Sequence, residues 1–177
     1  MNEEFKIAHP YPLKYNDRIK RLLLPYLLIL VIFLGIGLVS KESEDLFTWL
    51  LLTTLIFAVF IIRDVRRNRF YLTDFVASEF EILLGYQEFN QSRSIKISVE
   101  DIHVKLVNTS SRSGFNCELK MHAENLRFVI NDRFDWSLKE MKDLFIHYIA
   151  LKQLEMNELD KLNLSKIEEK IKKSRTN

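Results

Sequence analysis

The sequence predicts a membrane-spanning α-helical hairpin followed by a cytoplasmic α+β domain, in which a curled antiparallel sheet is closed by one C-terminal amphipathic helix. Two runs without a charged residue, residues 22–40 and 46–62, lie close together in the first part of the chain. Beyond them, apolar and polar residues alternate with a period of two, and apolar residues at three- and four-residue spacing follow. We therefore divide the chain into a basic N-terminal segment, a hairpin, a β-domain with its helix and a charged tail, at residues 1–21, 22–62, 69–156 and 157–177.

The overall composition is that of a folded chain. Of the 177 residues, 47% are hydrophobic and 28% are charged, which excludes a disordered, collagen-like or low-complexity protein. The single cysteine excludes a disulfide framework and a multi-cysteine metal site. A formal net charge of +2 gives no reason to expect a nucleic acid as partner.

The two uncharged runs are predicted to cross the membrane. They hold 19 and 17 residues, which as helices span about 28 and about 26 Å, close to the ~30 Å hydrocarbon core. Neither run has the polar stripe of a soluble surface helix, and two buried all-apolar helices need more surrounding protein than this chain supplies. Cleavage as a signal peptide is not expected, because the first run begins only at residue 22 and no A-x-A site follows it.

Basic residues flank the pair of runs but are scarce between them. Between the runs, Lys41 stands beside three acidic residues. Because Lys and Arg concentrate in short loops on the cytoplasmic side, both termini are predicted to be cytoplasmic and the turn to lie outside. Tyr26 and Trp49 fit the aromatic belts at the inner and outer interfaces. The flanking basic residues closest to the membrane are Lys14, Arg18, Lys20 and Arg21 before the first run and Arg63, Arg66, Arg67 and Arg69 after the second.

The interior of the hairpin contains no ionisable residue. Such residues usually mark ion paths and proton relays, so no channel or transporter machinery is expected. Four small or weakly polar residues either allow the helices to approach closely or are merely tolerated: Gly35, Gly37, Thr53 and Thr54.

The segment after the hairpin has the alternation of half-buried strands. Each apolar set is separated from the next by polar or Ser- and Asn-rich turns, as at residues 87–94 and 108–114. Alternation with one polar face favours an antiparallel sheet over one core, and no βαβ rhythm of a doubly wound fold is present. We predict six strands, at residues 69–76, 79–86, 95–99, 102–106, 115–121 and 126–130.

A helix is predicted to end the domain. Asp135 or Ser137 is a suitable N-cap, and Ser137 with Glu140 has the spacing of a capping box. Trp136 stands at the start of the helix, where it can cover the open end of the sheet. The charged tail that follows, residues 157–177, is either a loose amphipathic helix or a solvated segment.

This layout resembles that of pleckstrin-homology-like (PH-like) domains, and a hairpin placed before it is similar to the bacterial membrane-anchored PH-like proteins. The resemblance rests on residues 70–73 (FYLT), Gly85, residues 98–102 (SVEDI) and Trp136. It implies a seventh strand, which is either missed within residues 87–93 or absent. It also implies an inner-membrane location and a non-enzymatic role in protein interaction or assembly. The first strand pair lacks the dense Lys and Arg set of phosphoinositide-binding relatives, so head-group binding by the β-domain is not expected.

Candidate chemistry in the β-domain is sparse. By strand parity, His103 and His122 share the polar face, but two histidines without a third ligand do not indicate a metal site. Cys117 falls on the apolar face, as a buried structural cysteine does. No nucleophile elbow, phosphate-binding loop or zinc motif is present. The sequence therefore predicts no enzyme, no cofactor and no metal.

The clearest binding signal is the basic set beside the membrane. In a hairpin its two halves meet at the same leaflet, where each basic residue near an anionic surface contributes on the order of 1 kcal/mol. The alternative is that these residues only set the orientation. The expected partners are the bilayer with its anionic head groups, and a protein partner or further copies of the chain. Leu83 and Val107 are candidates for the protein contact, or else are packed in the core at a strand irregularity.

Two further functions remain open at this point. The chain could be an accessory subunit of a larger membrane complex, such as a transporter or secretion assembly, with its spans making the contact. It could also be an enzyme at the membrane surface whose site has no recognisable motif.

Overall fold

The computed structural model describes residues 5–40, 43–109 and 116–176. The chain forms two compact units. One, the hairpin unit, is Lys14–Arg69, and the other, the β-domain, is formed by the segments on both sides of it, Met1–Leu13 and Phe70–Asn177. Each unit is described separately below.

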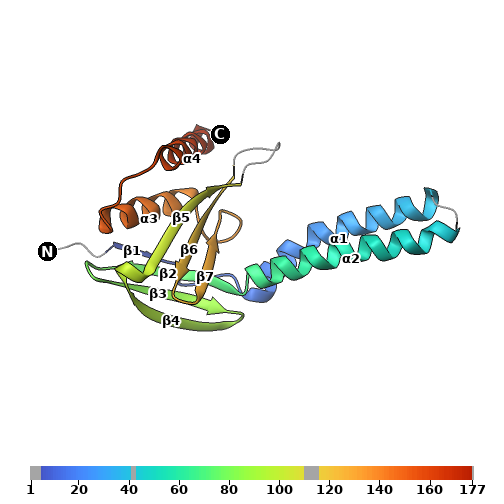
Figure 1. Ribbon diagram of the computed structural model, residues 1–177, viewed down its shortest axis with the longest axis horizontal. Helices are drawn as coiled ribbons and strands as arrows, with labels where there is room; N and C mark the ends of the chain where they lie inside the picture. The colour runs from blue at the N-terminus through green and yellow to red at the C-terminus, as the bar shows by residue number, and fades with distance from the viewer. Residues whose placement is uncertain (1–4, 41–42, 110–115, 177) are drawn as a thin grey trace. The chain divides into compact units, whose positions relative to one another are not determined.

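The hairpin unit consists of two long antiparallel helices, α1 (Tyr15–Ser40) and α2 (Ser43–Arg67), which lie side by side (Figure 1). Both are long and apolar enough to cross a membrane, over Tyr15–Gly37 and Thr48–Arg67. With 26 and 25 residues, the helices measure about 39 and about 38 Å, longer than the ~30 Å hydrocarbon core. The helical conformation therefore continues beyond the uncharged runs and through six of the eight flanking basic residues, while Lys14 and Arg69 lie just outside the helices.

Only part of the small-residue set lies between the two helices. A side chain at Gly37 would collide with the Trp49 ring of α2, whereas Gly35 has open space around it. Thr53 is buried and Thr54 is exposed. Gly37 and Thr53 therefore allow close approach of the helices, and Gly35 and Thr54 do not contribute to it.

The β-domain contains two antiparallel sheets in its described residues, not the single curled sheet that we predicted. The first sheet has the order β1-β2-β3-β4 and the second the order β5-β6-β7. The first four strands are β1 (Phe5–Ala8), β2 (Phe70–Ala77), β3 (Glu81–Glu88) and β4 (Gln91–Ser98). A short 3₁₀ turn, η1 (Val99–Asp101), leads to β5 (Ile102–Asn108), β6 (Cys117–Ala123) and β7 (Leu126–Ile130).

A seventh strand is present, but it does not lie within residues 87–93. The stretch 87–93 extends β3 and β4 around a tight turn instead of forming a separate strand. The additional strand is β1, from the segment that precedes the hairpin, and it pairs with β2 with Lys6 opposite Val76 and Ala8 opposite Asp74. A strand of four residues shows too little alternation to be recognised before its partner is known.

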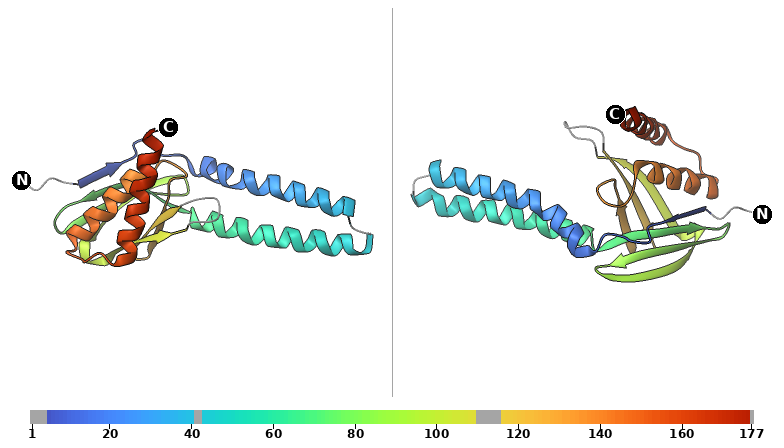
Figure 2. Two further views of the ribbon diagram at one scale, coloured as in Figure 1. Left: turned by 90° about the horizontal axis from the view of Figure 1, so that it is seen from above. Right: turned by 180° about the vertical axis from the view of Figure 1, so that it is seen from behind.

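One hydrophobic core joins both sheets to the two C-terminal helices, α3 (Leu138–Leu151) and α4 (Glu158–Thr176). The helices lie on one side of the strands, where α3 contacts β1 and β5, and α4 contacts α3 and β5 (Figure 2). The largest fully buried apolar side chains of this core are Trp136, Phe75, Phe128, Phe145, Leu72 and Ile82.

The start of α3 is held by local and long-range hydrogen bonds. Ser137 is the N-cap, and it forms the predicted capping box with Glu140 in both directions. Trp136 is buried and donates its indole N–H to the backbone oxygen of Leu72 at 2.9 Å. Asp135, the alternative N-cap, instead accepts hydrogen bonds from the Tyr71 hydroxyl and from the backbone N–H of Leu13.

The tail forms α4, so of the two alternatives the amphipathic helix is the one found. Leu164 and Ile167 are buried in the core, while Leu159 and Leu162 are exposed. Lys142 of α3 forms an ion pair with Glu168 of α4 at 2.6 Å. The domain is therefore covered by two helices, where we predicted one.

Candidate functional site

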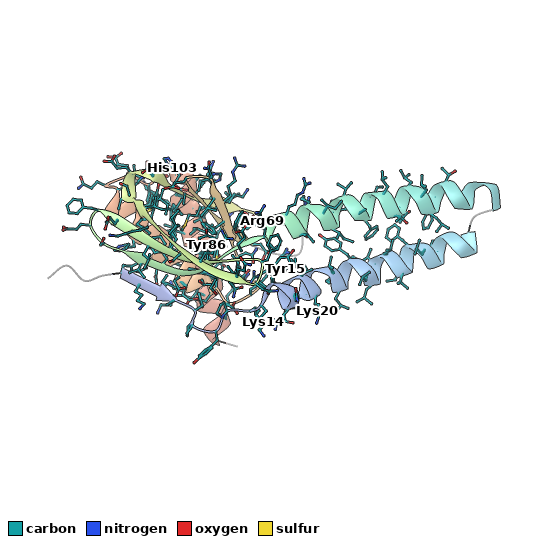
Figure 3. All side chains as sticks on the ribbon, turned by 90° about the horizontal axis from the view of Figure 1, so that it is seen from below. Lys14, Tyr15, Lys20, Arg69, Tyr86 and His103 are labelled. Atoms are coloured by element: carbon teal, nitrogen blue, oxygen red, sulfur yellow. The ribbon has the colours of Figure 1, made fainter. Side chains whose placement is uncertain are left out.

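The basic residues predicted to face the membrane surface gather at one end of the hairpin unit, where α1 begins and α2 ends. Lys14, Lys20 and Arg69 mark this end in Figure 3. Helix geometry explains the clustering, because an antiparallel pair places the first turns of one helix beside the last turns of the other. Six of the eight side chains are exposed: Lys14, Lys20, Arg21, Arg63, Arg66 and Arg69.

The two remaining basic residues are less accessible. Arg67 is half-buried. Arg18 is fully buried, with its guanidinium carbon 6.0 Å from the centroid of the Tyr15 ring. The six exposed side chains are therefore the ones that a head group can reach.

A contact that sequence reasoning missed ties the two helices together at this end. Asp64 of α2 is buried, and its Oδ2 accepts a hydrogen bond of 2.8 Å from the Tyr26 hydroxyl of α1. The Nε of Arg63 lies 3.5 Å from the other oxygen, and the Asn68 amide donates to the backbone oxygen of Asp64. Tyr26, which we assigned to the aromatic belt, thus also holds the α1 and α2 ends that carry the basic residues.

The charge at this end is strongly positive. Residues 14–21 and 63–69 contain eight Lys or Arg residues against two carboxylates, Asp17 and Asp64. At physiological ionic strength, charges act over about 8 Å, so neighbouring exposed cations on the two helices act on the same stretch of surface. This arrangement can attract anionic groups.

The candidate residues of the β-domain lie as strand parity predicts. His103 and His122 are direct partners across β5 and β6, and both are exposed. Within residues 5–40, 43–109 and 116–176, no group of three or more His, Cys, Asp or Glu could hold a metal ion. Leu83 is 43% exposed, so the alternative that it packs in the core is wrong. Val107 is half-buried.

Cys117 is buried on the inner face of β6, as predicted. Desolvation by burial, assisted by the nearby Asp132 carboxylate, raises the pKa of its thiol to about 11. A thiol in this state stays protonated at neutral pH and is a poor nucleophile. Cys117 is therefore a structural residue.

The fold and this site define a class of protein: a helical hairpin able to cross a membrane, joined to an α+β domain of two antiparallel sheets. No protein-family model matches the chain, and no curated protein matches it. What the protein does must therefore follow from its own residues.

Proposed function

We propose that the chain is a two-span inner-membrane protein with both termini in the cytoplasm. Its β-domain is PH-like and acts at the membrane surface as a non-enzymatic module for protein interaction or self-assembly. The basic end of the hairpin contacts anionic lipid head groups.

The observation that carries this proposal is the pairing of β1 with β2. β1 precedes the hairpin and β2 follows it, yet they are neighbours in one sheet, with Phe5 opposite Ala77. This pairing supports a topology in which both ends of the hairpin lie on the same side of a membrane and the chain crosses it an even number of times. This agrees with the distribution of Lys and Arg, which is an independent indication.

The connections between the units are short. Six residues separate β1 from α1, and two separate α2 from β2. At about 3.5 Å per residue, the connections reach at most about 25 and about 10 Å. The β-domain is therefore attached by two short connections and stays close to the bilayer, as an adaptor that presents a surface to neighbouring membrane proteins would.

The order of the strands supports the PH-like assignment. A four-stranded and a three-stranded antiparallel sheet, followed by a helix, correspond to the seven strands and C-terminal helix that the resemblance implies. β1 is the seventh strand, in addition to the six that the sequence predicted. The outer helix α4 is an addition to that layout.

Exposed cations support the lipid contact. Each contributes on the order of 1 kcal/mol near an anionic surface, so six of them add to the hydrophobic insertion and also hold the basic end at head-group depth. A triple variant with Gln in place of Lys14, Lys20 and Arg21 should be retained less well at anionic bilayers. Its retention at zwitterionic bilayers should not change, because the spans are still inserted.

Topology is the first test. A reporter fused after Asn177 should be active only on the cytoplasmic side, and one inserted at residues 41–45 only on the outer side. A fusion after Asn177 that is active outside contradicts the proposal, as does an intact chain that stays in solution without detergent.

The interaction role is tested by the mass of the particle in mild detergent. A discrete homo-oligomer supports self-assembly, and a second protein at fixed ratio after purification from native membranes supports the accessory-subunit form. Leu83→Glu should break the contact, while Leu162→Glu, at a similarly exposed apolar position on α4, should leave it intact. A monomer with no co-purifying protein contradicts the proposal.

A further inference from the structure

A hollow of about 370 Å³ lies on the outer face of the four-stranded sheet. A row of mutually paired residues, Ala8, Asp74, Gly85 and Ser94, crosses all four strands there. The hollow is lined by Thr73, Asp74, Gly85, Ser92, Arg93 and Ser94, together with the segment after β1. We call it the Asp74 hollow.

Three features that strands usually avoid meet in the Asp74 hollow. Asp74 lies in the interior of β2, although Asp is depleted in strands. The register of β2 against β3 shifts between Leu72 and Asp74, which indicates a β-bulge. Gly85 lies in the middle of β3, and glycine at such a position often marks a close approach. Departures from local preference concentrate at functional or strained sites.

Gly85 is needed because of the position of the Asp74 side chain. A Cβ atom at Gly85 would collide with the Asp74 carboxylate and would lie 2.9 Å from the Asp74 Cβ atom. The Asp74 side chain therefore lies against β3 at Gly85. The bulge and the glycine together place one negative charge in the centre of the sheet face.

This charge has no cationic partner among the residues that the structure describes. The Thr73 hydroxyl donates a hydrogen bond of 2.7 Å to Oδ2 of Asp74. Arg93, which also lines the hollow, forms an ion pair with Glu88 at 3.0 Å. By contrast, Glu81 on the same sheet is paired with Lys96 of the neighbouring strand.

We propose that the Asp74 hollow binds a primary ammonium group, with the carboxylate of Asp74 as its charge partner and the hydroxyls of Ser92 and Ser94 as further acceptors. Ammonium groups donate three hydrogen bonds and have no acceptor of their own, which suits this set of oxygens. A volume of about 370 Å³ is at the small end of ligand sites and takes a lysine side chain or a short amine.

Other cations fit the hollow less well. Calcium takes six to eight oxygen ligands and usually several carboxylates, and one carboxylate is available here. A guanidinium group prefers both oxygens of a carboxylate in a bidentate pair, and one lone pair of Oδ2 of Asp74 is already used by the Thr73 hydroxyl. The inference does not depend on the proposed function, because the site would exist whether or not the chain spans a membrane.

The test is an NMR titration of the full chain in non-ionic detergent micelles at constant ionic strength. The probes are n-butylammonium, Nα-acetyl-lysine methylamide and, as the neutral control, 1-butanol. Both cations should shift the amide resonances of Gly85 and Ser94 in a saturable way, and 1-butanol should not. Tighter binding of the lysine derivative indicates a lysine side chain of a protein as the natural ligand, and equal binding indicates a free amine.

Two variants separate binding from structure. Asp74→Asn retains an acceptor for the Thr73 hydroxyl but removes the charge, so it should weaken binding about tenfold or more. Glu81→Gln, which removes a carboxylate that already has a partner, should leave binding within about twofold. If Asp74→Asn does not fold, Ser94→Lys provides the second test, because its own ammonium group should block the probes.

The proposal is overturned if neither cation gives saturable shifts, or if 1-butanol gives the same shifts. It is also overturned if Asp74→Asn and Glu81→Gln change the binding of the cations by the same factor. Because oligomeric state plays no part in this measurement, its failure leaves the proposed interaction role untouched.

Discussion

Asp74 and Gly85 are direct partners across β2 and β3, and the side chain of the first occupies the space that a side chain of the second would need. The pair lies where the register of the two strands shifts. Asp74 is of a type that is depleted in strands, and Gly85 is of a type that weakens them. At this point of the sheet, the space left by Gly85 accommodates the Asp74 side chain.

Replacement of Gly85 by alanine should therefore destabilise the β-domain. The new methyl group collides with the Asp74 side chain, and forcing the two apart should cost about 1–3 kcal/mol. The measurement is the free energy of unfolding in non-ionic detergent. Ser94→Ala, next in the same cross-strand row but exposed, is the control and should change it by less than about 0.5 kcal/mol. A more stable Gly85→Ala protein would show that the Asp74 side chain moves away without cost.

The indole N–H of Trp136 should stabilise the folded protein in addition to the stabilisation from burial of the ring. Trp136→Phe keeps an aromatic ring but leaves the backbone oxygen of Leu72 without its donor, at a cost of about 1–3 kcal/mol. Thermal unfolding followed by circular dichroism measures this loss. The control is Tyr11→Phe, because Tyr11 is 94% exposed and its substitution should have no effect. Equal midpoints for the two variants would mean that the hydrogen bond contributes nothing.

The two glycines of α1 should respond differently to the same substitution. Gly37→Val places a side chain against the Trp49 ring and should separate the helices, lowering the stability of the hairpin by about 1–3 kcal/mol. Gly35→Val meets open space and should leave it unchanged or higher. Thermal unfolding of the full chain in detergent compares the two. Similar losses at both positions would contradict the packing of Gly37 on Trp49.

The thiol of Cys117 should be inert until the protein unfolds. With its pKa raised to about 11 by burial, little thiolate is present at pH 8. An aromatic disulfide reagent should therefore react with the folded protein far more slowly than with the chain in denaturant. His103→Cys, at an exposed position one strand away, should react at once in the folded state. Rapid labelling of Cys117 in the native protein would show that β6 opens readily.

Acidification should loosen the contact between β1 and α3. The ring of His147 stacks on that of Phe5, with the two ring centroids 4.2 Å apart. Desolvation by burial lowers the pKa of His147 below its usual 6.5. The unfolded chain then binds more protons than the folded one below pH 6.5, so stability is full above that pH and falls as the pH decreases through the folded pKa. Unfolding midpoints between pH 5 and pH 8 should show this decline, and His147→Phe should reduce it. An unchanged pH profile in that variant would exclude His147 as its source.

Local sequence was sufficient for the elements whose stability is local. The capping box at Ser137 and Glu140 involves residues three positions apart, so the start of α3 could be predicted. The strands β5, β6 and β7 also follow from alternation, because one face of each is buried. The opposed positions of His103 and His122 follow from the same parity.

For the basic end of the hairpin, the sequence predicted which charged residues gather there but not how their side chains pack. That Lys14 and Arg69 lie at the same end of the hairpin follows from its antiparallel form. The burial of Arg18 does not, and neither does the hydrogen bond from Tyr26 to Asp64, because both depend on tertiary packing. The Asp74 hollow was missed for a related reason: in the sequence Asp74 is one of several scattered carboxylates, and its isolation from cations appears only in the folded sheet.

By itself, the sequence determined that two helices are apolar on all sides, where the strand segments after them lie, and where α3 begins, since each depends on the composition or periodicity of one contiguous segment. Only the tertiary structure decided that Phe5–Ala8 is a strand, that the strands form two sheets, and that Asp74 lies over Gly85. These features arise from pairing between segments far apart in the chain, and a four-residue strand gains its stability from its partner β2 rather than from its own residues.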